Sequence, residues 1–136
     1  MSTPARIRYH WQLDVYKLSV EAATRIFGLT KLFPKEETYS LTDQIRRSSR
    51  SVSGQIAEGW RRRRYVAAFV NKLNEAEGEA AETLVWLVYS VLSGYLPAKD
   101  GRQLQRDYDV IIGKLVSMIN NPEPWLLHGA NRSQAL

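Results

Sequence analysis

Residues 41–64 read LTDQIRRSSRSVSGQIAEGWRRRR. The apolar residues of this stretch lie on one side of a helix with about 100° per residue; they are Leu41, Ile45, Val52, Ile56 and Trp60. Four arginines fall within roughly 60° on the opposite side, and a fifth lies about 40° further round. In that order they are Arg46, Arg50, Arg61 and Arg64, then Arg47. The stretch therefore predicts a helix with an apolar face toward a core and an arginine face toward something anionic.

The positive charge of the chain is concentrated in the same stretch. Between Arg46 and Arg64 there are seven arginines and a single acid, Glu58, which give a net charge of +6 in a chain whose total is +5. The four consecutive arginines at 61–64 repel one another, so we expect them to be solvated or occupied by an anion. Glu58 has no partner acid and no nearby histidine for catalysis, and we expect it to pair with Arg61 or Arg62.

Composition limits the class of protein. A chain of 136 residues with 44% hydrophobic and 24% charged residues suits one globular domain. It has no cysteine, which excludes disulfides and thiolate metal sites and suits a reducing compartment. The first ten residues are polar and basic, and no apolar run approaches the ~20 residues of a spanning helix. We therefore expect a cytoplasmic protein that is neither secreted nor inserted in a membrane.

Proline and glycine divide the chain into four helix-length pieces. The expected helices span residues 11–33, 36–60 and 66–93, with a fourth that starts between Ala98 and Arg102 and stops at Asn120-Asn121-Pro122. No strand-like alternation is present. The predicted architecture is all-α, an up-down four-helix bundle over residues 11–121, with a polar N-terminal tail (1–10) and a C-terminal tail (122–136).

Two segments predict close or extensive helix contacts. The second helix is rich in small residues between Ser48 and Gly54, which allows another backbone to approach. In the third helix nearly every residue from Leu84 to Leu92 is apolar, more than a single bundle can bury. This excess predicts a subunit interface that includes Val85, Trp86 and Tyr89.

The sequence offers no catalytic or metal-binding constellation. A di-iron bundle needs Glu-x-x-His on facing helices, whereas the chain has only His10 and His128, near its two ends. There is no glycine-rich phosphate loop, no nucleophile elbow and no zinc spacing. We expect no enzyme activity, no metal and no cofactor.

A long ordered motif identifies a family. It consists of Phe33-Pro34-Lys35-Glu36-Glu37, Tyr39, Leu41-Thr42, Gln44-Ile45-Arg46-Arg47, Ser51-Val52 and Ile56-Ala57-Glu58-Gly59. The chain resembles, from Trp11 to Ile119, the bacterial four-helix-bundle proteins associated with intervening sequences of large-subunit ribosomal RNA. Two positions depart from the family pattern: Gln55 replaces the usual asparagine and Glu79 the usual serine.

The resemblance implies a ring-like homopentamer of four-helix bundles with no known catalytic activity and with a basic surface that binds nucleic acid. A related group of bundles serves as accessory proteins to the reverse transcriptases of diversity-generating retroelements. It is similar in shape, basic and associated with RNA. The resemblance therefore also implies that a reverse transcriptase or another protein can be a partner.

The arginines allow two interpretations. In the first, they contact the phosphates of RNA or DNA, for which guanidinium groups are well suited; the candidates are Arg46, Arg47, Arg50, Arg61, Arg62, Arg63 and Arg64. In the second, they form ion pairs with Glu75, Glu79 and Glu82 of the same or a neighbouring subunit, and the protein is an oligomeric scaffold that docks other proteins. Four adjacent arginines cannot all pair with one acidic stripe, which favours nucleic acid at 61–64.

Aromatic residues next to the arginines also allow two interpretations. Trp60 and Tyr65 flank the four arginines at 61–64 and are the candidates for stacking on bases. They equally fit the core stripe or the end of a helix, and packing in the core is the use we expect.

Overall fold

The computed structural model describes residues 7–127, and within that range it contains helices and no strand. Its four α-helices are α1 (Asp14–Thr30), α2 (Leu41–Trp60), α3 (Val66–Leu92) and α4 (Ala98–Asn120). Three short 3-10 helices accompany them, η2 (His10–Gln12), η3 (Lys35–Glu37) and η4 (Glu123–Trp125). None of the helices in this range is long and apolar enough to cross a membrane. The predicted all-α class is confirmed.

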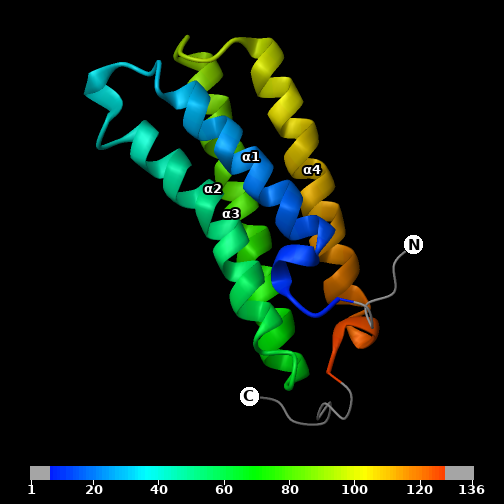
Figure 1. The fold of residues 1–136 in the computed structure, drawn as a ribbon. Helices are drawn as coiled ribbons and strands as arrows, with labels where there is room; N and C mark the ends of the chain where they lie inside the picture. Colours follow the sequence, from blue (N-terminus) through cyan, green and yellow to red (C-terminus); the bar gives the residue numbers. More distant parts are fainter. Residues whose placement is uncertain (1–6, 128–136) are drawn as a thin grey trace.

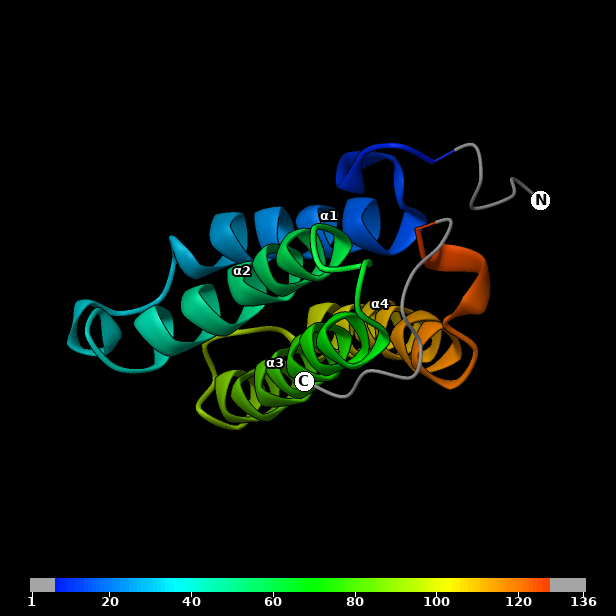
Figure 2. The same cartoon turned by 90° about the horizontal axis from the view of Figure 1, so that it is seen from below.

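The four α-helices run side by side, and each reverses direction relative to the one before it (Figure 1). Each helix packs on the next one along the chain, and α1 closes the arrangement by packing on α4. Seen from below, the four helices surround a common axis (Figure 2). This is the up-down four-helix bundle that the sequence predicts. Parts of the predicted tails also lie against its core, namely Ile7, Trp125 and Leu126.

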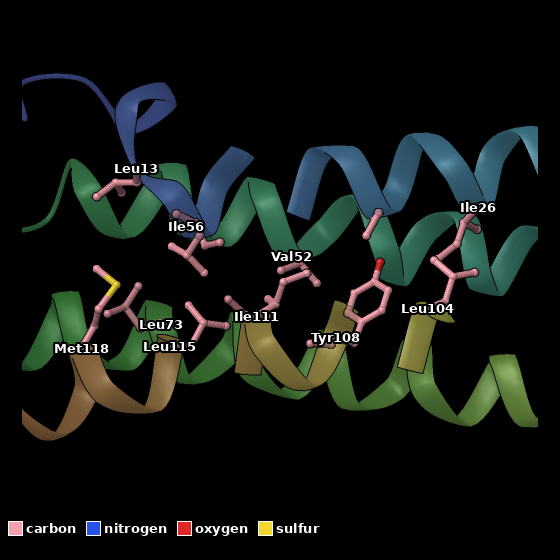
Figure 3. Packing of buried hydrophobic residues seen from close by; sticks show 14 of the residues in the cluster. Leu13, Ile26, Val52, Ile56, Leu73, Leu104, Tyr108, Ile111, Leu115 and Met118 are labelled. Atoms are coloured by element: carbon pink, nitrogen blue, oxygen red, sulfur yellow. The ribbon is translucent and has the colours of Figure 1, made fainter. Parts of the chain in front are cut away.

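The core is the space along the bundle axis where the apolar faces meet (Figure 3). It contains fully buried side chains from all four helices, among them Ile26, Val52, Ile56, Leu73, Leu104, Ile111 and Leu115. Tyr108 is also fully buried, and its hydroxyl has no hydrogen-bond partner among residues 7–127. Burial and the nearby charge of Asp107 raise the pKa of the Tyr108 hydroxyl, so the phenol stays neutral.

Two helices begin later than predicted. α1 begins at Asp14 and not at residue 11, because the side chain of Gln12 accepts hydrogen bonds from the backbone of Arg8 and Tyr9 and closes a separate turn. Trp11, with which the first helix was expected to begin, therefore precedes α1 and is 52% exposed. α2 begins at Leu41 and not near residue 36, because the backbone of Ser40 leaves the helical region with φ −128° and ψ −108°.

α2 ends at Trp60, with Arg61 as its C-cap, so the arginine face does not continue to Arg64. The predicted single arc of arginines is therefore wrong beyond Arg61. The chain must reverse after α2 to bring α3 back along it, and residues 61–64 form that turn. The backbone N–H of Arg61 still bonds to the carbonyls of Ala57 and Glu58, and Tyr65 is extended, with φ −122° and ψ 120°.

The small residues of α2 bring it close to α3, as predicted. Ser48 is fully buried, and its Oγ lies 2.8 Å from Oγ1 of Thr83 on α3. Each hydroxyl also lies near a carbonyl of its own helix, Thr83 Oγ1 at 2.9 Å from that of Glu79 and Ser48 Oγ at 3.4 Å from that of Ile45. Gly59 marks a second close approach, because a Cβ placed there would lie 3.1 Å from the Cβ of Lys72.

The two glycines of α2 provide a matched test of this close approach. A Cβ at Gly54 meets nothing within 4 Å, so Gly54→Ala is expected to raise the free energy of unfolding by up to ~1 kcal/mol through helix propensity. Gly59→Ala gains the same propensity but must push α3 away at Lys72, and is expected to be less stable than Gly54→Ala. Urea unfolding followed by circular dichroism, at matched protein concentration, compares them. Equal gains would contradict the close contact.

Candidate nucleic-acid interface

Three cations surround one aromatic ring where α2 packs on α1. The guanidinium carbons of Arg46 and Arg50 lie 4.5 Å and 5.0 Å from the centre of the Phe27 ring, and Nζ of Lys31 lies 5.0 Å from it. Cations at these distances are attracted to the ring by its quadrupole. The sequence pattern does not predict Lys31 as a site residue, since only the folded chain places the end of α1 beside α2.

Arg46 has a structural role in this cluster. Its Nε donates to Oγ1 of Thr30 at 2.8 Å, and its Nη2 donates to the carbonyl of Phe27 at 3.4 Å. These groups belong to the last turn of α1, where carbonyls lack helical partners and the dipole favours a cation. Arg46 is half-buried, whereas Arg50 is exposed. Arg50 and Lys31 are therefore the accessible charges of this cluster.

Arg47 points from α2 toward α3, whereas Arg46 points toward α1, and it neutralises two carboxylates of α3. It forms ion pairs with Glu82, through a short contact, and with Glu79 at 3.6 Å. The predicted pairing of Glu58 with Arg61 or Arg62 is wrong, because Glu58 instead bonds to Lys72 at 3.3 Å. Lys72 also reaches Glu75 at 3.0 Å, and its hydrogen bonds to Glu75 and Glu58 raise the pKa of its ammonium group. Arg47 and Lys72 thus form ion pairs with the acidic residues of α3.

The turn between α2 and α3 holds the remaining four arginines. Arg63 packs against Trp60, with its guanidinium carbon 3.5 Å from the centre of the Trp60 ring and its Nε donating to the Trp60 carbonyl at 2.7 Å. Burial, together with the charge of Arg61, lowers the pKa of Arg63. Arg61, Arg62 and Arg64 are exposed, and none forms an ion pair with a residue between 7 and 127.

Trp60 is a core residue, as expected, and not a stacking platform. Its side chain is 3% exposed, and its indole N–H donates to the backbone carbonyl of Arg8 at 3.0 Å. Tyr65 is 39% exposed at the start of α3. The bond from Trp60 fixes the N-terminal segment beside the arginine turn, which adds Arg8 to this end of the bundle. The interleaved basic and aromatic residues at 8–11 are the sequence signal for this segment.

The predicted interface residues lie on a partly exposed side of α3. Val85 and Tyr89 are 48% and 54% exposed, and Trp86 is half-buried. Val88 and Leu92, which belong to the same predicted apolar stretch from Leu84 to Leu92, extend this surface with exposures of 56% and 77%. We call these five residues the α3 apolar surface. A groove on each side of it separates α3 from α2 and from α4.

The described residues contain no group of three histidine, cysteine or acidic side chains that could hold a metal ion. His10 packs edge-on against Trp11 and Tyr16, with ring centres 5.1 Å and 4.9 Å away. His128, the other histidine, lies outside the described residues.

Comparison with known proteins agrees with this fold. The sequence model of the family described as 23S rRNA-intervening sequence protein matches residues 11–117. A crystal structure from Bacteroides thetaiotaomicron, described as a protein with unknown function from the S23 ribosomal protein family, is 32% identical. Its TM-score is 0.70, and the match covers 79% of this chain and 96% of that one. No curated protein matches the chain.

The ion pairs of Arg47 predict a charge-dependent contact between α2 and α3. Arg47→Glu places a third acid beside Glu79 and Glu82 and is expected to lower the free energy of unfolding by about 1 kcal/mol. Adding Glu82→Arg to the same chain restores an opposite-charge pair and is expected to recover much of the loss. Thermal unfolding of the single and double variants measures this. A double variant as unstable as the sum of both single changes would contradict the pairing.

Proposed function

The chain belongs to the 23S rRNA-intervening sequence protein family, and we propose that it is a non-catalytic protein that binds RNA or DNA through the phosphate backbone. The family description connects its members with ribosomal RNA, whereas the related crystal structure has no assigned function. The proposal therefore rests on the surface of this chain. We also propose a cytoplasmic setting, because a chain without cysteine suits a reducing compartment.

The observation that carries the proposal is the arginine turn. Arg61, Arg62 and Arg64 project three charges from one short turn without a carboxylate partner among the described residues. The acidic stripe of α3, the available source of neutralisation, already pairs with Arg47 and Lys72. Concentrated unpaired arginines attract a polyanion, and phosphate matches the planar fork of the guanidinium group.

The cluster at Phe27 extends the positive surface along α2. Arg50 and Arg61 are eleven residues apart, which corresponds to about 16 Å along a helix. Arg50 and Lys31 are both exposed, so a backbone that contacts the turn can continue toward them. Such contacts carry no base information, and we infer selection by charge density and shape.

We further propose that the protein assembles with copies of itself through the α3 apolar surface. Five partly exposed apolar side chains on one helix side exceed what isolated surface residues require. The family resemblance implies five subunits in a ring. Repetition of the arginine turn around a ring would strengthen a weak phosphate contact by effective concentration. A protein partner such as a reverse transcriptase would then meet a repeated surface.

An oligomeric scaffold that docks other proteins is the second candidate function. The observation that favours it is the same α3 apolar surface, together with the use of Arg47 in an ion pair within the chain. The two candidates differ in the role of the turn. A scaffold does not need Arg61, Arg62 and Arg64 for binding, whereas a nucleic-acid-binding protein does.

Neutralising the turn tests the proposed function. Replacement of all four residues from Arg61 to Arg64 by glutamine is expected to abolish binding to a labelled RNA or DNA oligonucleotide at low salt. Fluorescence anisotropy measures this binding. Variants in which only some of the four arginines are replaced should bind with a shallower dependence of affinity on salt concentration. On a single strand the log–log slope should fall by about 0.7 for each phosphate that the variant no longer neutralises. The oligomer mass should not change.

A matched control removes four charges elsewhere. Lys99, Arg102, Arg106 and Lys114 are exposed on α4, and their replacement by glutamine lowers the net charge by the same amount. We expect this control to retain most of the affinity. Equal reductions of affinity in both variants would indicate attraction by net charge alone, and an unchanged affinity in the turn variant would refute the assignment.

Charge on the α3 apolar surface tests the assembly. Val85→Asp with Tyr89→Asp is expected to reduce the mass measured by light scattering toward that of one chain, because each subunit contact would bury an unpaired carboxylate. The expected mass before the change is that of five chains. A monomeric parent protein, or a double variant with the parent mass, would contradict the proposed interface.

A further inference from the structure

We propose that the nucleic acid is single-stranded and that an unpaired base stacks on the exposed ring pair of Tyr9 and Trp11. This inference rests on the proposed function and specifies its ligand. The two rings belong to the N-terminal turn that precedes α1. They lie 4.3 Å apart between centres, with an angle of 4° between their planes. They therefore form a ready-made aromatic stack on the surface of the bundle.

The ring pair is exposed although its backbone is well fixed. Tyr9 is 42% and Trp11 52% exposed. The side chain of Gln12 accepts hydrogen bonds from the backbone N–H groups of Arg8 and Tyr9 at 2.8 Å and 2.9 Å. His10, between the two rings in sequence, packs its edge against Tyr16 of α1. A rigid turn with large apolar rings directed partly into water loses little conformational entropy when a ligand binds.

The stack lies at the same end of the bundle as the arginine turn. The indole N–H of Trp60 donates to the carbonyl of Arg8 at 3.0 Å, and the guanidinium carbon of Arg63 lies 3.5 Å from the centre of the same Trp60 ring. Figures 1 and 2 show the N-terminal turn beside the lower end of α1, at the end where α2 joins α3. The Arg8 guanidinium carbon lies 5.4 Å from the Tyr9 ring centre. Cations and open aromatic rings therefore occupy one region.

This combination distinguishes a single strand from a duplex. Proteins that bind single strands combine a positive surface for the backbone with aromatic rings on which bases stack. In a duplex the bases are already stacked and paired, so a surface ring reaches no base face without unstacking it. Arginines alone would bind either form through phosphate. The exposed stack next to them supplies the contact that only an unpaired base can use.

The experiment compares single-stranded and duplex oligonucleotides of equal length, each as RNA and as DNA, by fluorescence anisotropy on the full chain. The parent protein is expected to bind the single strands more tightly. Trp11→Ala is expected to weaken single-strand binding about tenfold, the order of one base stack, and to leave duplex binding and the salt slope unchanged. Trp11→Phe retains a ring and should recover most of the affinity. The RNA and DNA arms show which sugar is preferred.

A spectroscopic readout separates stacking from a general loss of affinity. A single-stranded oligonucleotide that contains the fluorescent base 2-aminopurine is used for this purpose. Stacking quenches this base, so its fluorescence is expected to fall when the parent protein binds. At a saturating concentration of the Trp11→Ala variant the fall should be smaller. Thermal unfolding of Trp11→Ala should match the parent, because the side chain is half exposed.

The outcomes of the two proposals are distinguishable. If Trp11→Ala binds single strands like the parent while the glutamine variant of Arg61 to Arg64 loses binding, the stacking inference is overturned and the proposed function stands. If the parent protein binds duplex and single strand with equal affinity, the stacking inference is likewise overturned and the proposed function stands. If the parent binds none of the four oligonucleotides at low salt, both proposals are overturned.

Discussion

The close packing of α2 on α3 is the constraint on which the rest of the structure depends. Ser48 and Gly59 are small enough for the two helices to approach, with a hydrogen bond to Thr83 at one point and the Cβ of Lys72 near the other. This approach requires the chain to reverse directly after Trp60. The four arginines that follow must then form the turn, where they have no helical neighbours to pair with.

The same packing decides how each arginine is used. Arg47 points toward α3 and pairs with its acids, while Arg46 points toward α1 and bonds to its last turn. Arg61, Arg62 and Arg64 lie beyond these helix contacts and are exposed. Trp60 places the N-terminal aromatic turn beside the arginines, because its buried indole N–H donates a hydrogen bond to the backbone carbonyl of Arg8. One short contact thus joins two segments that are distant in sequence.

The features of the fold that depend on the periodic spacing of residues can be predicted from the sequence. The four helices, the core face of α2 and the role of its serines follow from the spacing of apolar and small residues, and the structure confirms them. Features that depend on tertiary contacts are mispredicted. The end of α2 breaks the expected arc of arginines, and Glu58 pairs with Lys72 on α3 and not with a neighbour in sequence. The sequence pattern places Tyr9 in a tail and Trp11 at the start of the first helix. It does not show their turn, because the bond that positions this turn comes from Trp60, about fifty residues away in sequence.

We propose that the arginine turn and the neighbouring N-terminal segment together contact an external nucleic acid. Ultraviolet cross-linking of the protein to a single-stranded oligonucleotide, followed by mass spectrometry of its peptides, measures this contact residue by residue. Nucleotide adducts are expected to concentrate on peptides that contain residues 8–12 and 61–65. Adducts confined to α4, or spread evenly over the surface, would contradict it.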